Sequence, residues 1–380
     1  MLGLSSFMSF QPFLAKYDEN GADMKKTDKL LLNIFLLCFL ALLGGCMRKP
    51  LPPVPVLIPQ HTIDYLAEVK PILDKRCVVC HSCYNSPCQL KLSSYDGLER
   101  GATKKAVYDS GRLETMDPTR LFIDAVGREQ WDKKGFFSVT ESSSEGQLND
   151  SIMLQLLSHK MKNPVSHGEY KPEADDLTCS ESTSELSSYL YKHPNRGMPF
   201  GFPPLKQDEF NLIAGWLAQG AQGPVGAEKD ALESISPADL PSIRKWEEFL
   251  NQEDAKHVMT ARYLYEHLFL AHIHFSSDSK NFYELVRSRT APDDPVDVIA
   301  TVRPYDDPGG DFYYRFRRIH STIVYKTHMV FTLDDQAYRR YNELFIEPSW
   351  QTEPKIMGYG KKESADPFFT FEQIDRKSVV

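Results

Sequence analysis

The chain has no uninterrupted apolar run long enough for an ordinary transmembrane helix. Its longest such run, residues 30–43, is broken by Asn33 and falls short of the roughly 20 apolar residues that a bilayer requires. Basic residues are also scarce, because 44 Lys and Arg face 52 Asp and Glu, which gives a formal net charge of −8. We therefore expect no nucleic-acid partner. No repeat of fixed period and no low-complexity tract occurs, and 380 residues suffice for two or three cores.

The first fifty residues carry an export signal. A basic stretch at residues 25–29 precedes the apolar run, which is the arrangement of a bacterial signal peptide. The run ends in Leu43-Gly44-Gly45-Cys46, which resembles a lipoprotein cleavage box, so Cys46 is predicted to receive a lipid. The alternative is a plain secretory signal or an uncleaved anchor with Cys46 incidental. Since Met24 directly precedes the lysines, the true start is expected at Met24.

Five residues have the spacing of c-type haem attachment, Cys77-Val78-Val79-Cys80-His81. Two thiols separated by two residues can each reach one vinyl group of the porphyrin, and the adjacent histidine then lies under the iron as the proximal ligand. A zinc pair would need a second, separate C-x-x-C or an H-x-x-x-H, and a thioredoxin-type motif needs a βαβ pattern; neither is present. The sequence predicts one covalent haem c at Cys77, Cys80 and His81. Apolar residues at helical spacing between 63 and 73 are typical of the first helix of a cytochrome c domain.

A second iron ligand is expected in the Pro/Gly-rich loop at residues 195–205, where Met198 offers one thioether. The loop leads into residues 205–217, whose apolar positions predict a short amphipathic helix. This order is typical of the closing segment of class I cytochromes c, so Met198 is the predicted distal ligand. The alternatives are a sixth position left open, or one of three histidines on the iron: His159, His167 or His193.

The interval between His81 and Met198 is longer than compact cytochromes use. Most of the excess lies in the polar stretch 135–176, which we interpret as an insertion with one helix at 148–160 and loops.

Three further cysteines follow the haem motif. In an oxidising compartment, Cys83 and Cys88 are expected to pair with each other, or one of them with Cys179. The sequence leaves the choice open.

Longer strings of residues resemble those of bacterial fatty acid cis/trans isomerases. In chain order they are residues 76–81, 83–84, 87–95, 100–102, 197–199, 201–203, 261–272, 284–290 and 300–309. The resemblance covers most of the chain after about residue 60 and is far more specific than the haem motif alone. Members of this family are considerably longer, and the resemblance stops near residues 369–371. The chain is therefore expected to be truncated relative to the family, which bears on its activity.

The resemblance implies a periplasmic haem enzyme that converts cis to trans double bonds in phospholipid acyl chains without net redox change. Rotation about an intact double bond has a prohibitive barrier, which an electrophilic ferric haem can lower by withdrawing electron density. With His81 and Met198 both on the iron, no coordination position is free. Either Met198 is labile, or electron transfer runs through the haem edge. The implied partners are a membrane phospholipid or unsaturated fatty acid and the haem-maturation machinery.

The expected fold is a mainly α cytochrome c-like haem domain followed by an α+β module. Residues 1–46 hold the signal peptide and lipobox, 47–60 a Pro-rich tether, 61–222 the haem domain and 223–380 the module, incomplete at its C-terminus. Within the module we expect helices at residues 241–278 and strands at 312–318 and 322–332. Its clustered histidines, His267, His272 and His274, are interpreted as core or surface residues, with a metal or second-haem role as the alternative.

Two other functions compete with the isomerase. In an electron-transfer cytochrome c, residues 60–222 would carry electrons and the rest would dock a partner. A haem peroxidase would need an open iron site. The family-like strings outside the haem segment favour the isomerase, because a simple carrier does not need them.

Overall fold

The computed structural model describes residues 51–57, 59–82, 86–105, 117–141, 151–164, 179–277, 279–350, 355–360 and 364–374. Contacts divide the chain into Met1–Lys49 and Pro50–Val380, and every described residue belongs to the second unit. The predicted signal peptide and the lipidation residue Cys46 lie outside the described residues, as do Cys83 and His167. Among the helices of the described part, none combines the length and apolar character that a membrane span requires.

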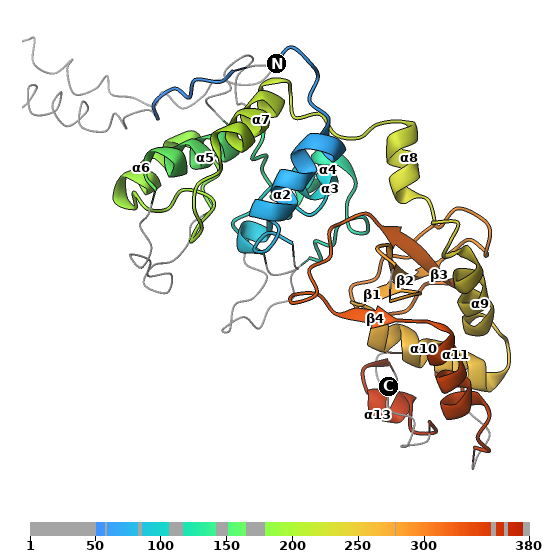
Figure 1. Cartoon of the computed structure of the whole chain (residues 1–380). Coiled ribbons are helices and arrows are strands. Elements are labelled where there is room, and N and C mark those ends of the chain that lie inside the picture. The colour runs from blue at the N-terminus through green and yellow to red at the C-terminus, as the bar shows by residue number, and fades with distance from the viewer. Residues whose placement is uncertain are drawn as a thin grey trace, which may run out of the picture. The chain divides into compact units, whose positions relative to one another are not determined.

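Helices fill the first part of this unit and a small sheet lies in the second (Figure 1). The elements are η1 (Tyr65–Val69), α2 (Lys70–Arg76), η2 (Pro87–Gln89), α3 (Tyr95–Arg100), α4 (Gly127–Lys133), α5 (Ile152–Lys162), α6 (Thr183–Lys192), α7 (Gln207–Ala218), α8 (Ala227–Glu233), α9 (Leu240–Leu250), α10 (Ala255–Leu268), β1 (His272–His274), β2 (Phe282–Ser288), β3 (Tyr313–Ile319), β4 (Val330–Thr332), α11 (Asp335–Tyr341), η5 (Asn342–Ile346) and α13 (Pro367–Thr370).

Several helices begin at a side chain that caps their free amide groups. Ser151 accepts a hydrogen bond from the Leu154 amide at the start of α5, and Ser94 and Ser182 do the same for α3 and α6. Helix α7 starts with the Glu209 carboxylate accepting from the Lys206 amide. The helices predicted before Cys77, within 148–160 and within 205–217 are thus confirmed as η1–α2, α5 and α7.

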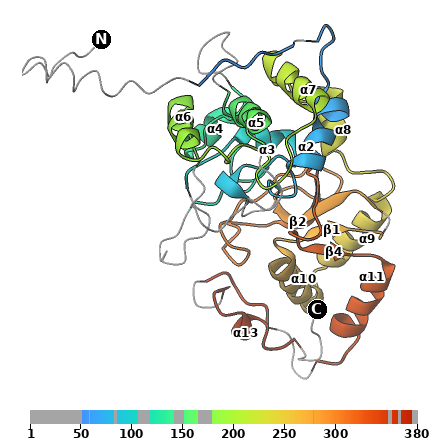
Figure 2. The same cartoon turned by 60° about the vertical axis from the view of Figure 1, so that its left-hand side comes forward.

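The sheet is mixed, with the strand order β3-β2-β1-β4. Strands β2 and β3 pair antiparallel over their whole length, β1 pairs antiparallel with β2, and β1 runs parallel to β4. Helices α9 and α10 pack against it, and Figure 2 shows α9, α10 and α11 beside the strands from a second side. One hydrophobic core lies under these elements, and another joins η1, α2, α5 and α7.

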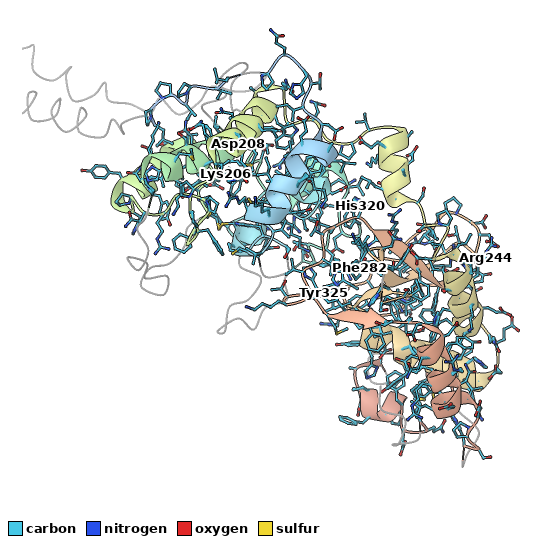
Figure 3. All side chains as sticks on the ribbon, in the orientation of Figure 1. Lys206, Asp208, Arg244, Phe282, His320 and Tyr325 are labelled. Atoms are coloured by element: carbon cyan, nitrogen blue, oxygen red, sulfur yellow. A yellow bond between two sulfur atoms is a disulfide. The ribbon has the colours of Figure 1, made fainter. Side chains whose placement is uncertain are left out.

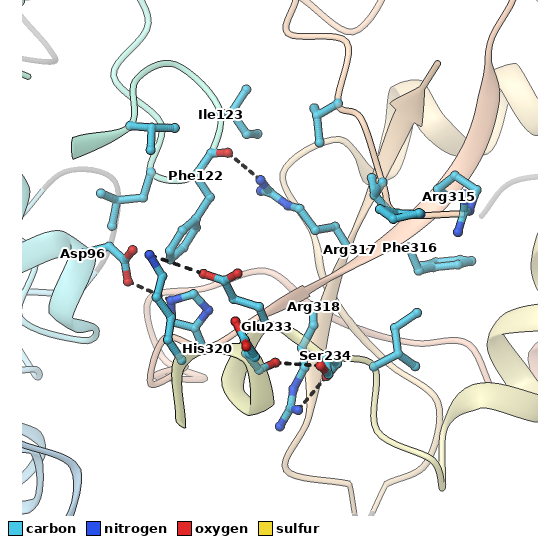
Figure 4. Close-up of a pocket in the computed structure, with 18 of the residues that line it drawn as sticks. Asp96, Phe122, Ile123, Glu233, Ser234, Arg315, Phe316, Arg317, Arg318 and His320 are labelled. Carbon is cyan, nitrogen blue, oxygen red and sulfur yellow. Dashed lines mark hydrogen bonds and ion pairs between the residues drawn. The ribbon is translucent and has the colours of Figure 1, made fainter. Parts of the chain in front are cut away.

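Direct contacts tie the helical segment to the sheet. The Asp96 carboxylate of α3 accepts a hydrogen bond of 2.7 Å from His320, and Arg317 of β3 donates one of 2.7 Å to the Phe122 carbonyl (Figure 4). The Thr322 amide donates to the Ser93 carbonyl over 2.9 Å. Figure 3 accordingly places His320 where the two groups of elements meet.

The expected fold class is wrong. The described chain is α+β overall, and it shows no clear all-α haem domain of the cytochrome c type. The apolar periodicities before Cys77 and after residue 205 predict helices correctly, but periodicity says nothing about which elements those helices meet. The contacts at Ser93, Asp96 and Phe122 instead attach the segment after the haem motif to strand β3 and the loop that follows it.

Two local predictions in the second half also change. The helices expected over residues 241–278 end at Leu268, and His272 and His274 lie in β1, where Ile273 pairs with strands on both sides. A β-branched residue between two partners is favoured in a sheet centre. Strand β3 confirms the strand expected at 312–318, whereas only Val330–Thr332 of the segment 322–332 forms a strand.

Candidate functional site

The haem motif borders a cavity between α2, α5, α6 and the loop that precedes α7. Cys77, Cys80, His81 and Met198 all line it. The remaining wall is mostly apolar and consists chiefly of Leu90, Leu92, Ala102, Phe137, Val139, Ile152, Met153, Leu156, Leu157, Leu186, Phe200 and Phe202. The structure therefore brings together the four residues predicted to hold the haem, in mostly apolar surroundings.

His81 is held in the form that a metal requires. Its Nδ1 lies 3.1 Å from the Leu90 carbonyl oxygen, to which it donates a hydrogen bond, so the lone pair is left on Nε2. Burial lowers the pKa of His81 and outweighs the opposing effect of that hydrogen bond. The imidazole is therefore neutral near pH 7, which is its ligating form.

Met198 borders the same cavity as His81, whereas two of the alternative ligands do not. The Met198 amide donates to the Leu156 carbonyl over 3.2 Å, which attaches the loop to α5. His159 forms a hydrogen bond with the Pro194 carbonyl, and His193 stacks near Tyr189; neither lines the cavity. This placement favours Met198 over both histidines, and its role as an iron ligand stays a prediction.

The cysteines separate into a free pair and a bridged pair. Cys77 and Cys80 form no disulfide, and burial raises the pKa of the Cys77 thiol to about 12. Cys88 is bonded to Cys179, with 5.5 Å between their Cα atoms, and both also line the cavity. The structure thus contains the Cys88–Cys179 disulfide, which is one of the pairings that the sequence left open.

Two arginines border the cavity. Arg76 directly precedes the motif and donates from Nε and an η nitrogen to Glu209 over 2.9 and 2.6 Å, which joins α2 to α7. Arg196 lies over the Phe200 ring at 4.6 Å. Cationic side chains at an otherwise apolar cavity suit a ligand with a broad apolar body and acidic groups.

These residues fit a c-type haem. Two thiols without a disulfide, a neutral imidazole with an orienting carbonyl, a thioether and an apolar wall form the donor set that the group needs. Arg76 is already paired with Glu209, so Arg196 is the arginine of the cavity wall that would face a propionate carboxylate. Among the described residues, no three His, Cys, Asp or Glu side chains gather as another metal site.

Sequence reasoning missed one wall of the cavity. The stretch 135–176, interpreted as an insertion, contributes Phe137 and Val139 and the side chains of α5 that face the motif, Ile152, Met153, Leu156 and Leu157. Their spacing of one and four residues is the available signal. The Leu90 carbonyl could not be found in this way, because a backbone acceptor leaves no trace in the residue type.

Comparison with protein families gives one result. The family described as fatty acid cis/trans isomerase (CTI) matches residues 116–379, a range that includes Met198 and begins after the haem motif. No curated protein and no solved structure matches the chain. The match places the chain in a class of isomerases that act on fatty acids. Since the match spans more than half of the chain, the chain belongs to the fatty acid cis/trans isomerase family.

Proposed function

We propose that this chain converts cis to trans double bonds in the acyl chains of membrane phospholipids, using one haem bound covalently through Cys77 and Cys80. The proposal places it in the periplasm, anchored to a membrane by a lipid on Cys46. The observation that carries it is the shared cavity of Cys77, Cys80, His81 and Met198 in a chain of the isomerase family.

The haem, when bound, supplies an electrophilic iron that withdraws electron density from the double bond and so lowers its barrier to rotation. His81 would hold the iron on one side, kept neutral by burial and oriented by the Leu90 carbonyl. The apolar wall would exclude water and admit hydrocarbon. Arg76 would keep the motif in place through Glu209.

Met198 would be the second protein ligand of the haem iron, and we propose that it would bind weakly enough to be displaced. Its thioether is a weaker and more exchangeable donor than an imidazole. The backbone of Met198 is held to α5 by the hydrogen bond from its amide to the Leu156 carbonyl. A labile Met198 would leave the iron accessible to substrate while His81 keeps the haem in place.

The test is to express the chain with haem-maturation machinery and to supply phospholipid with cis-monounsaturated chains and no reductant. Trans product measured by gas chromatography supports the proposal. The matched control is a Cys77→Ser, Cys80→Ser variant, which should carry no covalent haem and yield no trans product.

The same preparation distinguishes the isomerase from the competing function, an electron-transfer cytochrome c. Reduction of the haem by a quinol or a partner cytochrome, without trans product, would replace the isomerase with an electron-transfer cytochrome c. Absence of any tethered tetrapyrrole in the mass spectrum would reject the cofactor itself.

A further inference from the structure

A second cavity of about 710 Å³ lies beside the haem-motif cavity and takes no part in the site described above. Helix α10, strand β2, the loop before α4 and the loops around residues 300–305 and 323–329 contribute its walls. Its size is that of a small-molecule pocket. Much of its lining is apolar, including Phe269, Leu285, Ile299, Ile319 and Ile323.

The two cavities are separated by a single thickness of chain. Leu90 and Leu92 line the haem-motif cavity, whereas their neighbours Lys91 and Ser93 line the second one. Alternate side chains of an extended segment point to opposite sides, so residues 90–93 form a wall with one face in each cavity. The same holds at the motif, where His81 borders the first cavity and Ser82 the second.

Exposed apolar side chains converge at the rim of the second cavity. Leu270, Val302 and Met329 come from three separate segments and are 65%, 50% and 46% exposed, although each also lines the cavity. Tyr325, on the same loop as Met329, is exposed and lies edge-on to Phe282 (Figure 3). Large apolar side chains gathered around an opening are costly in water and mark a surface that meets an apolar partner.

Positive charge accompanies this rim. The cations that line the cavity are Lys91, Arg120, Arg287 and Arg303, and its carboxylates are Glu266 and Glu284. Both carboxylates are paired with arginines that do not line it, Glu266 with Arg262 and Glu284 with Arg317. Arg120 is likewise neutralised by Asp124. Arg303, on the rim loop, has a half-exposed side chain and forms only a long ion pair of 3.8 Å with Asp306.

Buried Arg287 holds the rim loop in place. It donates to the Asp306 carbonyl over 2.9 Å and to the Thr301 hydroxyl over 2.8 Å, on either side of Val302 and Arg303. The apolar and the cationic residue of that loop are therefore presented together at the opening. An apolar side chain beside a cationic one suits the interface of an anionic bilayer, where Val302 would contact the hydrocarbon and Arg303 the phosphate groups.

We propose that the rim of Leu270, Val302 and Met329 docks on an anionic phospholipid bilayer and that the second cavity takes up one acyl chain from it. The inference deepens the proposed function by giving the lipid an entry next to the haem-motif cavity. It needs neither haem chemistry nor turnover, so it is testable by binding alone.

The first test measures flotation of the full chain with vesicles of phosphatidylethanolamine and phosphatidylglycerol. All forms carry Cys46→Ser, so that no lipid anchor contributes. Leu270→Asp, Val302→Asp and Met329→Asp should each weaken vesicle binding roughly tenfold. The control Val225→Asp alters a side chain that is 74% exposed and lies outside this cavity, and should change binding less than about twofold.

Charge is tested in the same assay. Replacing phosphatidylglycerol by neutral lipid, or raising the salt concentration, should weaken binding of the parent. Rim variants that float as well as the parent would overturn the proposal. Trans product from detergent-dispersed lipid, by a parent that does not bind vesicles, would overturn it while leaving the isomerase intact.

Uptake of a chain is tested with a tryptophan in the cavity. Phe269→Trp places an indole where Arg120 now lies over the Phe269 ring at 5.3 Å. Vesicles with brominated acyl chains should quench this added emission, measured against the parent to subtract its native tryptophans. Docking without quenching would show that the surface binds and the cavity stays closed to lipid, which rejects the uptake half of the proposal.

Discussion

Glu209 is the residue on which the attachment of the haem motif to helix α7 depends. Its carboxylate accepts from Arg76 and from the Lys206 amide, and the hydrogen bonds from Arg76 lower its pKa to about 2. Glu209→Gln should lower the free energy of unfolding by about 2 kcal/mol, since it removes a charge-assisted hydrogen bond. Urea unfolding checks this, with the exposed Glu248→Gln as the control.

The same pair predicts a dependence on pH. Because the pKa of folded Glu209 lies below its ordinary value of 4.5, its contribution is complete above about pH 4.5 and is lost as the pH falls toward 2. Unfolding of the parent should therefore become easier over that interval, and Glu209→Gln should show less of this decline. Equal slopes in the two proteins would contradict the role of the pair.

Met198 offers a spectroscopic test at the level of one atom. Met198→Ala should leave the haem attached, as judged by mass, and change the absorption bands that report the axial ligands. Met161→Ala is the matched control, because Met161 packs against the same core and does not line the cavity. Ligand bands that do not change would reject Met198 as the ligand.

At the residue scale, residue type and spacing predicted which four side chains gather at the cavity, but they did not determine the disulfide partner of Cys88. The motif spacing singled out Cys77, Cys80 and His81, and the Pro/Gly-rich loop singled out Met198; all four line one cavity. The choice of Cys179 for Cys88 could not be made, because it depends on where the chain returns after 91 residues.

At the scale of elements, the Cys88–Cys179 disulfide ties η2 to the segment before α6. A bond that closes a loop of this length restricts the unfolded chain strongly. Cys88→Ser with Cys179→Ser should therefore lower the free energy of unfolding by about 4 kcal/mol. The denaturant midpoint measures it, and a midpoint equal to that of the parent would contradict the prediction.

Elements were predicted best where a pattern is long and self-contained. Helix α7 has both a cap and a sustained apolar face, and it forms where expected. Strand β1 shows the opposite case, since three residues of alternating His and Ile after a helix carry too short a period. Its partners β2 and β4 supply the hydrogen bonds that make it a strand.

For the whole molecule, the ties between α3, the Phe122 loop and β3 predict one unfolding event. Trp216 lies in the helical core and Trp246 in the sheet core, so each reports on one of them. Variants that keep a single one of these two tryptophans as reporter should melt at the same temperature. Two separated transitions would show that the cores unfold independently.

Asp96→Asn tests the tie itself. Burial raises the pKa of Asp96, but the hydrogen bond from His320, the charges of His320 and Lys229 and a backbone hydrogen bond together outweigh it, so the pKa of Asp96 is lowered. The variant should lower the melting temperature by several degrees, while Asp117→Asn, at an exposed position, should not. The fold-class prediction failed at this junction, because contacts between residues 195 to 229 positions apart leave no local pattern.

The wall that residues 90–93 form between the two cavities should be sensitive to insertions and deletions. Its leucines and its Lys91 and Ser93 are sorted by odd and even position alone. Inserting one residue just ahead of Leu90 would turn both leucines out of the haem-motif cavity and the ammonium group of Lys91 into it, although none of the four residues is replaced. We therefore expect residues 90–93 to tolerate conservative substitutions far better than the insertion or deletion of a residue.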